Sequence, residues 1–351
     1  MLPLQQLSVG MLAGVMALVL FSTVDAQHGS WGYTGDTGPT TWANNFPSWC
    51  NGQKQSPIDV QSKSATQKSF PALTFKGFDT PPADAQMRIK NNGHAIQVDL
   101  LSKTGKSDNY QISGGGLPGT YNVLQFHFHW GSEHTVNGKR YDAEMHVVTW
   151  NAKYPSASAA STVTPDGFAV MSVLLEIHMV TWNTKYRDVY EARDNKDGLA
   201  ALSVPIAATS KTANPGMQNI VSQLSNVANK GMNYTYPTSF SVNSLFPADK
   251  ANYWRYMGSL TTPKCNEVVV WTIFKTSLKI SQDQINALKS SCYFNPAGDQ
   301  EQQSLNNNYR PTQPLNGRTV FDSSSTSGVP QLAPTVLALL IAVISSTALQ
   351  L

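Results

Sequence analysis

The chain has 351 residues, of which 41% are hydrophobic and only 13% are charged. This apolar fraction is large enough to bury a sizeable core, so global disorder is excluded. The formal net charge is +3 and no basic block occurs along the chain, which argues against nucleic acid as a partner.

The first 26 residues predict a secretory signal peptide. An apolar run over residues 9–21 is followed by Val24-Asp25-Ala26, which is a small-residue cleavage pattern. We therefore expect cleavage after Ala26 and a mature domain that begins at residue 27.

The middle of the chain predicts a mainly β fold. Short runs rich in Val, Phe, Tyr and Trp alternate with polar residues and are bounded by Gly, Pro, Asn and Asp. Helical periodicity is limited, and residues 217–228 are the best candidate. We expect strands at residues 95–100, 123–130, 144–150, 168–177 and 267–274, mostly antiparallel and with a few helices around them.

A stretch of roughly 31 residues occurs twice in tandem, at 144–173 and 176–204. EMHVVTWNAKY at residues 144–154 and EIHMVTWNTKY at residues 176–186 agree at eight of eleven positions. Two copies are too few for a solenoid. A duplicated exon or an error in assembling the sequence would explain them.

Cysteines and a sequon agree with the secretory route. In an oxidising compartment two of Cys50, Cys265 and Cys292 should pair and one is left over, but the sequence does not choose among the three pairings. The sequon Asn233-Tyr234-Thr235 predicts glycosylation of Asn233.

Residues 323–351 predict a membrane anchor. The apolar run at 336–344 continues to Leu351 with no Lys or Arg after it, and small residues with a short polar spacer precede it. This pattern is typical of a GPI-anchor signal, and a single transmembrane helix is the alternative. Either anchor places the domain on the outer face of the plasma membrane; without one it would be secreted.

The candidate metal-binding residues lie in the segment Gln125-Phe126-His127-Phe128-His129-Trp130. Strand alternation puts Gln125, His127 and His129 on one face. A third imidazole, His146, could come from the next strand after a turn at residues 136–139. Three neutral imidazoles leave one open position on a tetrahedral zinc ion, as in catalytic sites. A pair of packed or surface histidines is the alternative.

Two polar residues flank these histidines on the same face. Gln125 and Glu144 each lie two residues from a histidine. They are placed to bond the ring nitrogens that face away from a metal and so to fix the tautomers.

Residues 27–322 resemble an α-class carbonic anhydrase. The motifs, in the order of the family, are Trp31-Gly32-Tyr33, Gln55-Ser56-Pro57-Ile58-Asp59, Asn91-Asn92-Gly93-His94, residues 125–131, Ser132-Glu133-His134-Thr135-Val136, Ser259-Leu260-Thr261-Thr262-Pro263 and Tyr309-Arg310-Pro311. The resemblance implies an α+β, mainly β domain around one large twisted, mostly antiparallel sheet. It also implies a zinc lyase that hydrates carbon dioxide reversibly to bicarbonate and a proton, by attack of zinc-bound hydroxide.

The resemblance also implies roles for single residues. His127, His129 and His146 would hold Zn²⁺, and Thr261 would orient the reacting hydroxide through an ionised Glu133. His94 would shuttle the proton, with Tyr33, Asn92 and Gln97 ordering the water chain; an exposed turn histidine is the alternative. The substrate pocket would be formed by Val148, Val170, Leu260, Thr262, Val269 and Trp271.

The extracellular members of the family imply the Cys50–Cys265 disulfide. Cys292 is then expected to be a buried free thiol, with an intermolecular bridge as the alternative. Of the other histidines, we interpret His28 as terminal and His134 as structural.

The chain departs from the family pattern in two places. The loop between Trp130 and Glu133 is shorter than usual, and the repeat offers His178, beside Glu176, as an alternative third ligand. We favour His146, with residues 168–177 as the next strand and residues 178–205 as an insertion. If the second copy displaced the first, His178, Val180 and Ala201 would form the site instead.

Two functions compete. The first is an active, membrane-anchored enzyme; a zinc esterase is its nearest rival in chemistry. The alternative is a catalytically silent relative that acts as a binding or matrix protein. No oligomeric state is predicted.

Overall fold

The computed structural model describes residues 30–324 except 107, 118, 152–180, 183–198, 211–212 and 268. For residues 148, 150, 151, 181–182 and 199–210 it describes the backbone only. The predicted signal peptide, His28, the strand expected at 168–177, Val170, Glu176, His178 and Val180 therefore lie outside the described residues. So does nearly all of the predicted anchor.

Strands dominate the described part of the chain. They are β1 Asp59–Val60, β2 Thr66–Gln67, β3 Leu73–Lys76, β4 Ala85–Asn91, β5 Ile96–Ser102, β6 Gln111–Gly114, β7 Tyr121–Trp130, β8 Thr135–Val136, β9 Lys139–Arg140, β10 Ala143–Asn151, β11 Thr181–Trp182, β12 Leu199–Ser210, β13 Asn233–Thr235, β14 Tyr253–Gly258, β15 Val269–Phe274, β16 Leu278–Ser281 and β17 Phe321–Asp322. The α-helices are α2 Trp42–Asn45, α3 Pro47–Cys50, α6 Pro215–Val221 and α7 Gln282–Ser290, and the 3₁₀ turns are η2 Gly35–Thr37, η3 Ser62–Ser64, η5 Leu224–Val227 and η6 Val242–Leu245.

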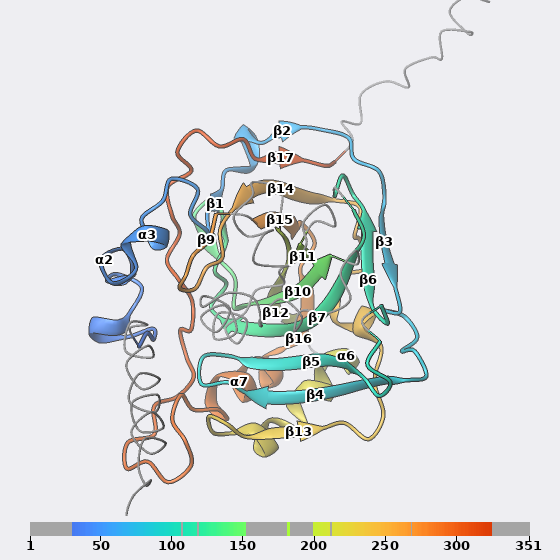
Figure 1. Ribbon diagram of the computed structural model, residues 1–351, viewed down its shortest axis with the longest axis vertical. Helices are drawn as coiled ribbons and strands as arrows, with labels where there is room; N and C mark the ends of the chain where they lie inside the picture. Colours follow the sequence, from blue (N-terminus) through green and yellow to red (C-terminus); the bar gives the residue numbers. More distant parts are fainter. Residues whose placement is uncertain are drawn as a thin grey trace, which may run out of the picture.

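One large sheet forms the centre of the molecule. Its main path runs β13-β4-β5-β7-β10-β12-β15-β14-β17-β2, and most neighbours are antiparallel. The parallel pairs in the described part of this sheet are β12 with β15, β12 with β16, and β17 with β2. Figure 1 shows the sheet from β13 at the bottom to β2 and β17 at the top, with α2 and α3 at its left and with α6 and α7 overlapping β4 and β5 in this view. The predicted mainly β, mostly antiparallel fold is confirmed.

The central strands are buried on both faces. Along β7 nine of the ten residues are buried, because Phe126, Phe128 and Trp130 pack into the main core on one face while the histidines fill the other. On β4, nearer the end of the sheet, burial alternates strictly, as expected for a strand with one face toward solvent. The histidine strand therefore lies in the buried central part of the sheet.

Four of the five expected strands occur close to their predicted places, as β5, β7, β10 and β15. The helix expected at 217–228 is shorter: α6 ends at Val221 and a 3₁₀ turn, η5, follows. The N–H of Gln223 bonds the carbonyl of Ile220, three residues back, and such tightening is common at helix ends.

The prediction for the repeat is wrong in one respect. The strand beside β10 is β12, from the second copy, although residues 178–205 were expected to be the insertion. β12 pairs with β10 from Ala143↔Ile206 to Val148↔Ala201 and with β15 on its other side. Residues 199–210 therefore lie between β10 and β15 in the sheet. Only a few residues separate the end of β12 from the start of α6. The described sheet thus combines His146 of the first copy with the strand of the second.

No helix among the described residues is both long enough and apolar enough to span a bilayer.

Candidate metal centre and active site

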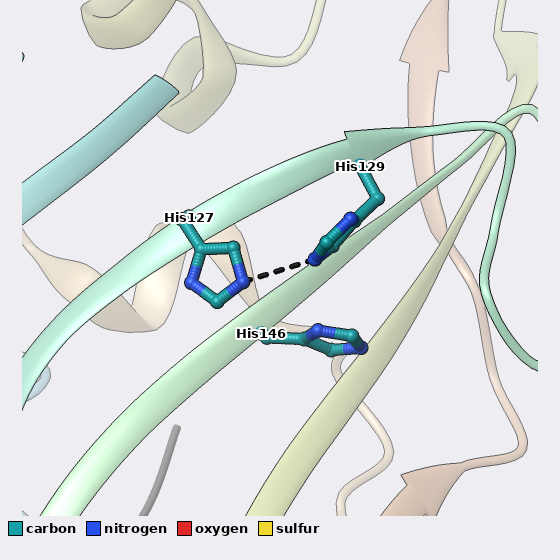
Figure 2. Close-up of side chains that lie close together, drawn as sticks. All are labelled: His127, His129 and His146. Atoms are coloured by element: carbon teal, nitrogen blue, oxygen red, sulfur yellow. Dashed lines mark hydrogen bonds between the residues drawn. The ribbon is translucent and has the colours of Figure 1, made fainter. Parts of the chain in front are cut away.

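Three histidines meet between two neighbouring strands. Antiparallel pairing of β7 with β10 sets His146 opposite His127 and Glu144 opposite His129. Figure 2 shows the rings of His127 and His129 from one strand and of His146 from the next, turned toward one another. All three side chains are buried, and one ring nitrogen of each lies within 4.8 Å of the others.

The tautomer of each ring follows from the bond on its outer side. His129 Nδ1 lies 2.5 Å from the carbonyl oxygen of Asn308, and His127 Nδ1 lies 3.4 Å from Gln125 Oε1. His146 Nε2 lies 2.7 Å from Glu144 Oε1. These partners are acceptors, so the outer nitrogens carry the protons and the inner nitrogens carry lone pairs.

The inner nitrogens fit a metal ion. The Nε2 atoms of His127 and His129 are 3.0 Å apart, and Figure 2 marks this contact by a dashed line. If both rings carry their protons on Nδ1, two lone pairs face each other here and repel, and a bound cation would relieve that repulsion. Two nitrogens on a tetrahedral zinc ion lie about 3.3 Å apart, given Zn–N bonds of about 2.0–2.1 Å. Burial lowers the pKa of all three rings, that of His129 to about 3, so the imidazoles are neutral at pH 7, as a metal requires.

Glu144 connects the third histidine to a second buried network. The same Oε1 that accepts from His146 lies 2.8 Å from Nδ1 of His134, whose Nε2 lies 2.7 Å from the hydroxyl of Tyr256. The two imidazoles hold the pKa of Glu144 well below its usual range against the opposing effect of burial. His134 thus belongs to the supporting structure, in agreement with its interpretation from the sequence.

Thr261 and Glu133 form a second pair beside the histidines. Both side chains are fully buried, and Thr261 Oγ1 donates to Glu133 Oε2. The N–H of Arg310 donates to Glu133 Oε1 over 2.8 Å. Burial raises the pKa of Glu133 well above its usual value, and these two hydrogen bonds offset only part of that rise.

His94 lies on the loop between β4 and β5. Its half-buried ring stacks on Trp31 with centroids 4.2 Å apart, and the ring of Tyr33 is 6.4 Å away. Burial, with a smaller effect of Lys230, lowers the pKa of His94 to about 3. Asn92 bonds the N–H groups of His94 and Ala95 through Oδ1.

Gln97 lies between this loop and the histidine cluster. Its Oε1 accepts a hydrogen bond of 3.1 Å from Asn92, and Gln97 is the strand partner of His127. Asn92 and Gln97 therefore form a polar connection from the His94 loop toward His127.

Apolar side chains border the cluster. Leu260, Val269 and Trp271 are buried, as is Thr262, and the Trp271 ring lies 5.1 Å from that of His146. For Val148 the backbone alone is described, and Val170 lies outside the described residues. The structure thus brings four of the six predicted pocket residues to the strands and the loop that border the histidines.

Asn308 and Arg310 belong to the site, although the sequence analysis gave them no role. The Asn308 carbonyl fixes His129, and its Nδ2 donates to the carbonyls of Phe128 and His94. Arg310 donates through Nη1 to Gln55 and Ser56. The Tyr309-Arg310-Pro311 motif was the one signal that pointed to this segment.

The predicted disulfide is confirmed. Cys50 of α3 is bonded to Cys265, which follows Thr261 on the same loop. Cys292 is unpaired and buried, and burial raises the pKa of its thiol to about 12. Asn233 is exposed on β13, so its glycosylation stays a prediction.

Comparison with known proteins gives a consistent family. A family model described as eukaryotic-type carbonic anhydrase matches residues 37–177 and again 174–324. Human carbonic anhydrase 12 is 33% identical over 327 residues, which cover 89% of this chain and 80% of that protein. Mouse carbonic anhydrase 1 is 35% identical over 297 residues, which cover 83% of this chain and 97% of that protein. The two family matches meet at residues 174–177, where the second repeat copy begins, so each match contains one copy.

Proposed function

The chain belongs to the eukaryotic-type carbonic anhydrase family, and we propose that it hydrates carbon dioxide reversibly at a zinc ion held by His127, His129 and His146. One observation carries this proposal: three neutral imidazoles converge with their lone pairs inward, and each outer nitrogen already faces an acceptor. Zn²⁺ in such a site lowers the pKa of a bound water to about 7, an effect for which carbonic anhydrase is itself the standard example.

Thr261 and Glu133 would orient the reaction. Because Thr261 Oγ1 donates its proton to Glu133, its lone pairs remain to accept a proton from the reacting water. This role requires Glu133 in its ionised form, which the N–H of Arg310 stabilises against the effect of burial. The apolar side chains of Leu260, Val269 and Trp271 suit an uncharged substrate better than polar anchors would.

His94 would move the product proton to solvent. Its backbone N–H bonds Asn92, whose side-chain amide donates to Gln97, the strand partner of His127. In the stack on Trp31 its pKa is about 3, so the ring must leave that stack to carry a proton at neutral pH.

The test is carbon dioxide hydration by the purified, zinc-loaded protein in a pH-indicator stopped-flow assay, with a sulfonamide inhibitor as the control. We expect fast, inhibitable hydration. Folded, zinc-loaded protein without activity would contradict the proposal and favour the silent binding or matrix protein.

A matched pair of variants tests the third ligand. We expect His146→Ala to abolish zinc binding and His178→Ala, at the same position of the second copy, to leave zinc content unchanged. The opposite result would assign the site to the second copy.

We further propose that the domain is outside the cell and GPI-anchored through residues 323–351. The Cys50–Cys265 disulfide supports an oxidising compartment, and the apolar C-terminal tail supports an anchor. Phosphatidylinositol-specific phospholipase C should release activity from cells that express the full chain. Resistance to the enzyme would instead favour a transmembrane helix.

A further inference from the structure

A second cavity lies away from the histidines, near the end of the sheet where β14, β17 and β2 run side by side (Figure 1). Its volume is about 510 Å³, which is the size of a small-molecule site. β12 and β15 separate β14 from β10 in the sheet. The side chains that give the cavity its character are four cations and three aromatic rings: Lys54, Lys68, Arg255, Arg318, Phe70, Tyr256 and Phe321.

Among the residues that line the cavity, Arg255 is unusual because its charged side chain is buried. Its side chain is only 5% exposed, its Nε donates to Thr272, and its buried Nη2 has no hydrogen-bond partner. The guanidinium lies 5.3 Å from the ring of Phe70 and 5.2 Å from that of Tyr253. Aromatic faces offset part of the cost of burying a charge. The aromatic rings do not accept a hydrogen bond from the Nη2 group of Arg255. A buried donor without an acceptor destabilises the folded protein.

The surrounding charges leave this region positive. Arg318 is held by carbonyl groups, those of Gln55, Leu315 and Pro314 among them, rather than by a carboxylate. Lys68 lies over the ring of Phe321 at 4.6 Å. Among the described residues that line the cavity, none has an acidic side chain.

The nearest carboxylates are already engaged. Asp322 pairs with Lys275, and Glu267 accepts from the backbone N–H of Lys54 and from Gln55. Four cations around an apolar cavity without a neutralising acid favour a multiply charged ligand.

We propose that this cavity binds a small organic phosphate, with the phosphoryl group on Arg255 and Lys68 and an apolar body against Phe70 and Phe321. A phosphate monoester carries close to two negative charges at neutral pH, and the planar guanidinium fork matches its oxygens. The ligand is either a free phosphate ester or a phosphate lipid headgroup, because the cavity adjoins β17, which directly precedes the proposed membrane anchor at residues 323–351. This inference is independent of the proposed reaction.

Phenylphosphonate, a stable aromatic dianion, is the probe. We expect one saturable site on the full-length, zinc-loaded protein by calorimetry, with weaker binding as salt is added. Methylphosphonate, which lacks the ring, should bind more weakly. Arg255→Leu should weaken binding at least about tenfold, since it removes a charge-assisted donor.

Lys68→Gln, an exposed and structurally mild change, should weaken binding about threefold or more. If the Arg255→Leu variant does not fold, the Lys68→Gln variant still tests the proposal. Lys63→Gln removes the same charge from an exposed position outside the cavity, and it should leave the affinity unchanged.

Vesicles of phosphatidylcholine with and without phosphatidic acid distinguish the sources. Co-sedimentation that needs phosphatidic acid and Arg255 would identify a lipid headgroup, and binding of soluble phenylphosphonate alone would identify a free ester. No binding of either probe overturns the proposal. Unchanged binding of phenylphosphonate in both the Arg255→Leu and Lys68→Gln variants would also overturn the proposal. The anion would then bind elsewhere, for example at the histidines.

Discussion

At the scale of single residues, the hydroxyl of Thr261 joins a buried carboxylate to the proposed reaction centre. Thr261→Val keeps the shape of the side chain and removes the donor to Glu133. We expect the turnover number for carbon dioxide hydration to fall by about 10²-fold, the typical effect of losing one oriented polar group in a dry site. Zinc content should not change, because Thr261 is not among the three histidines proposed to hold the metal.

Thr261→Ser is the matched control, since it retains the hydroxyl and should retain most of the activity. Stopped-flow hydration with parallel zinc analysis separates the two variants. Equal activity of the Val and Ser variants would show that Glu133 does not act through this hydroxyl.

His94 gives a pH prediction. Its folded-state pKa of about 3 lies below the usual value of about 6.5. Between these two values the unfolded chain therefore binds more protons than the folded one. The contribution of His94 to stability is complete above pH 6.5 and is lost as the pH falls toward 3.

Trp31→Ala removes the ring on which His94 stacks. We expect the pKa of His94 to rise toward 6.5 as the imidazole becomes hydrated, and the acid sensitivity of unfolding to weaken. An NMR titration of the His94 ring measures the shift, and Trp49→Ala, on α3, serves as the control. An unchanged pKa in the Trp31 variant would mean that the stack does not set it.

At the scale of elements, alternation along one strand was enough to predict the histidine pair. Gln125, His127 and His129 share a face because side chains on a strand alternate, and β7 confirms this placement. Asn308 escaped prediction because its bond to His129 joins residues 179 positions apart. No local pattern encodes such a contact.

The repeat shows a different limit. Both copies contain a similar strand-forming sequence. Strand propensity therefore cannot choose between residues 168–177 and 199–210. Pairing of β12 with both β10 and β15, together with its short connection to α6, makes the choice in the described structure. The position of the strand beside β10 therefore depends on pairing between distant residues, which the sequence pattern does not reveal.

Two deletions test this arrangement. Removal of residues 155–186 leaves β10 and all of β12 intact and deletes only the two-residue β11 from the described sheet. We expect this variant to fold and to bind zinc. Removal of residues 178–205 cuts β12 in half, takes away most of its partners for β10 and β15, and should abolish cooperative unfolding.

Circular dichroism melts and zinc analysis of the two deletion variants give the comparison. A stable, zinc-binding protein after removal of residues 178–205 would mean that the first copy can supply the strand beside β10.

At the scale of the whole molecule, the N-terminal segment is fastened to the loop of Thr261. The Cys50–Cys265 bond spans a sequence separation of 215, and Gln55 donates to the carbonyl of Cys265. Arg310 reaches the carbonyl of Cys50 from the C-terminal part of the chain. Three distant segments thus meet beside the proposed site.

Opening this disulfide should lower the stability of the whole domain. A crosslink that closes so long a loop limits the freedom of the unfolded chain, and its loss costs about 3–5 kcal/mol. We expect the Cys50→Ser/Cys265→Ser double variant to show this loss in urea unfolding monitored by tryptophan fluorescence. A reductant should destabilise the wild-type protein by a similar amount and leave the double variant unaffected, which separates loss of the bond from the effect of the serines. Since the histidines proposed to hold zinc lie on β7 and β10 rather than on this loop, the folded double variant should still bind zinc. A wild-type protein whose stability does not change with the reductant would show that the bond does not stabilise the fold.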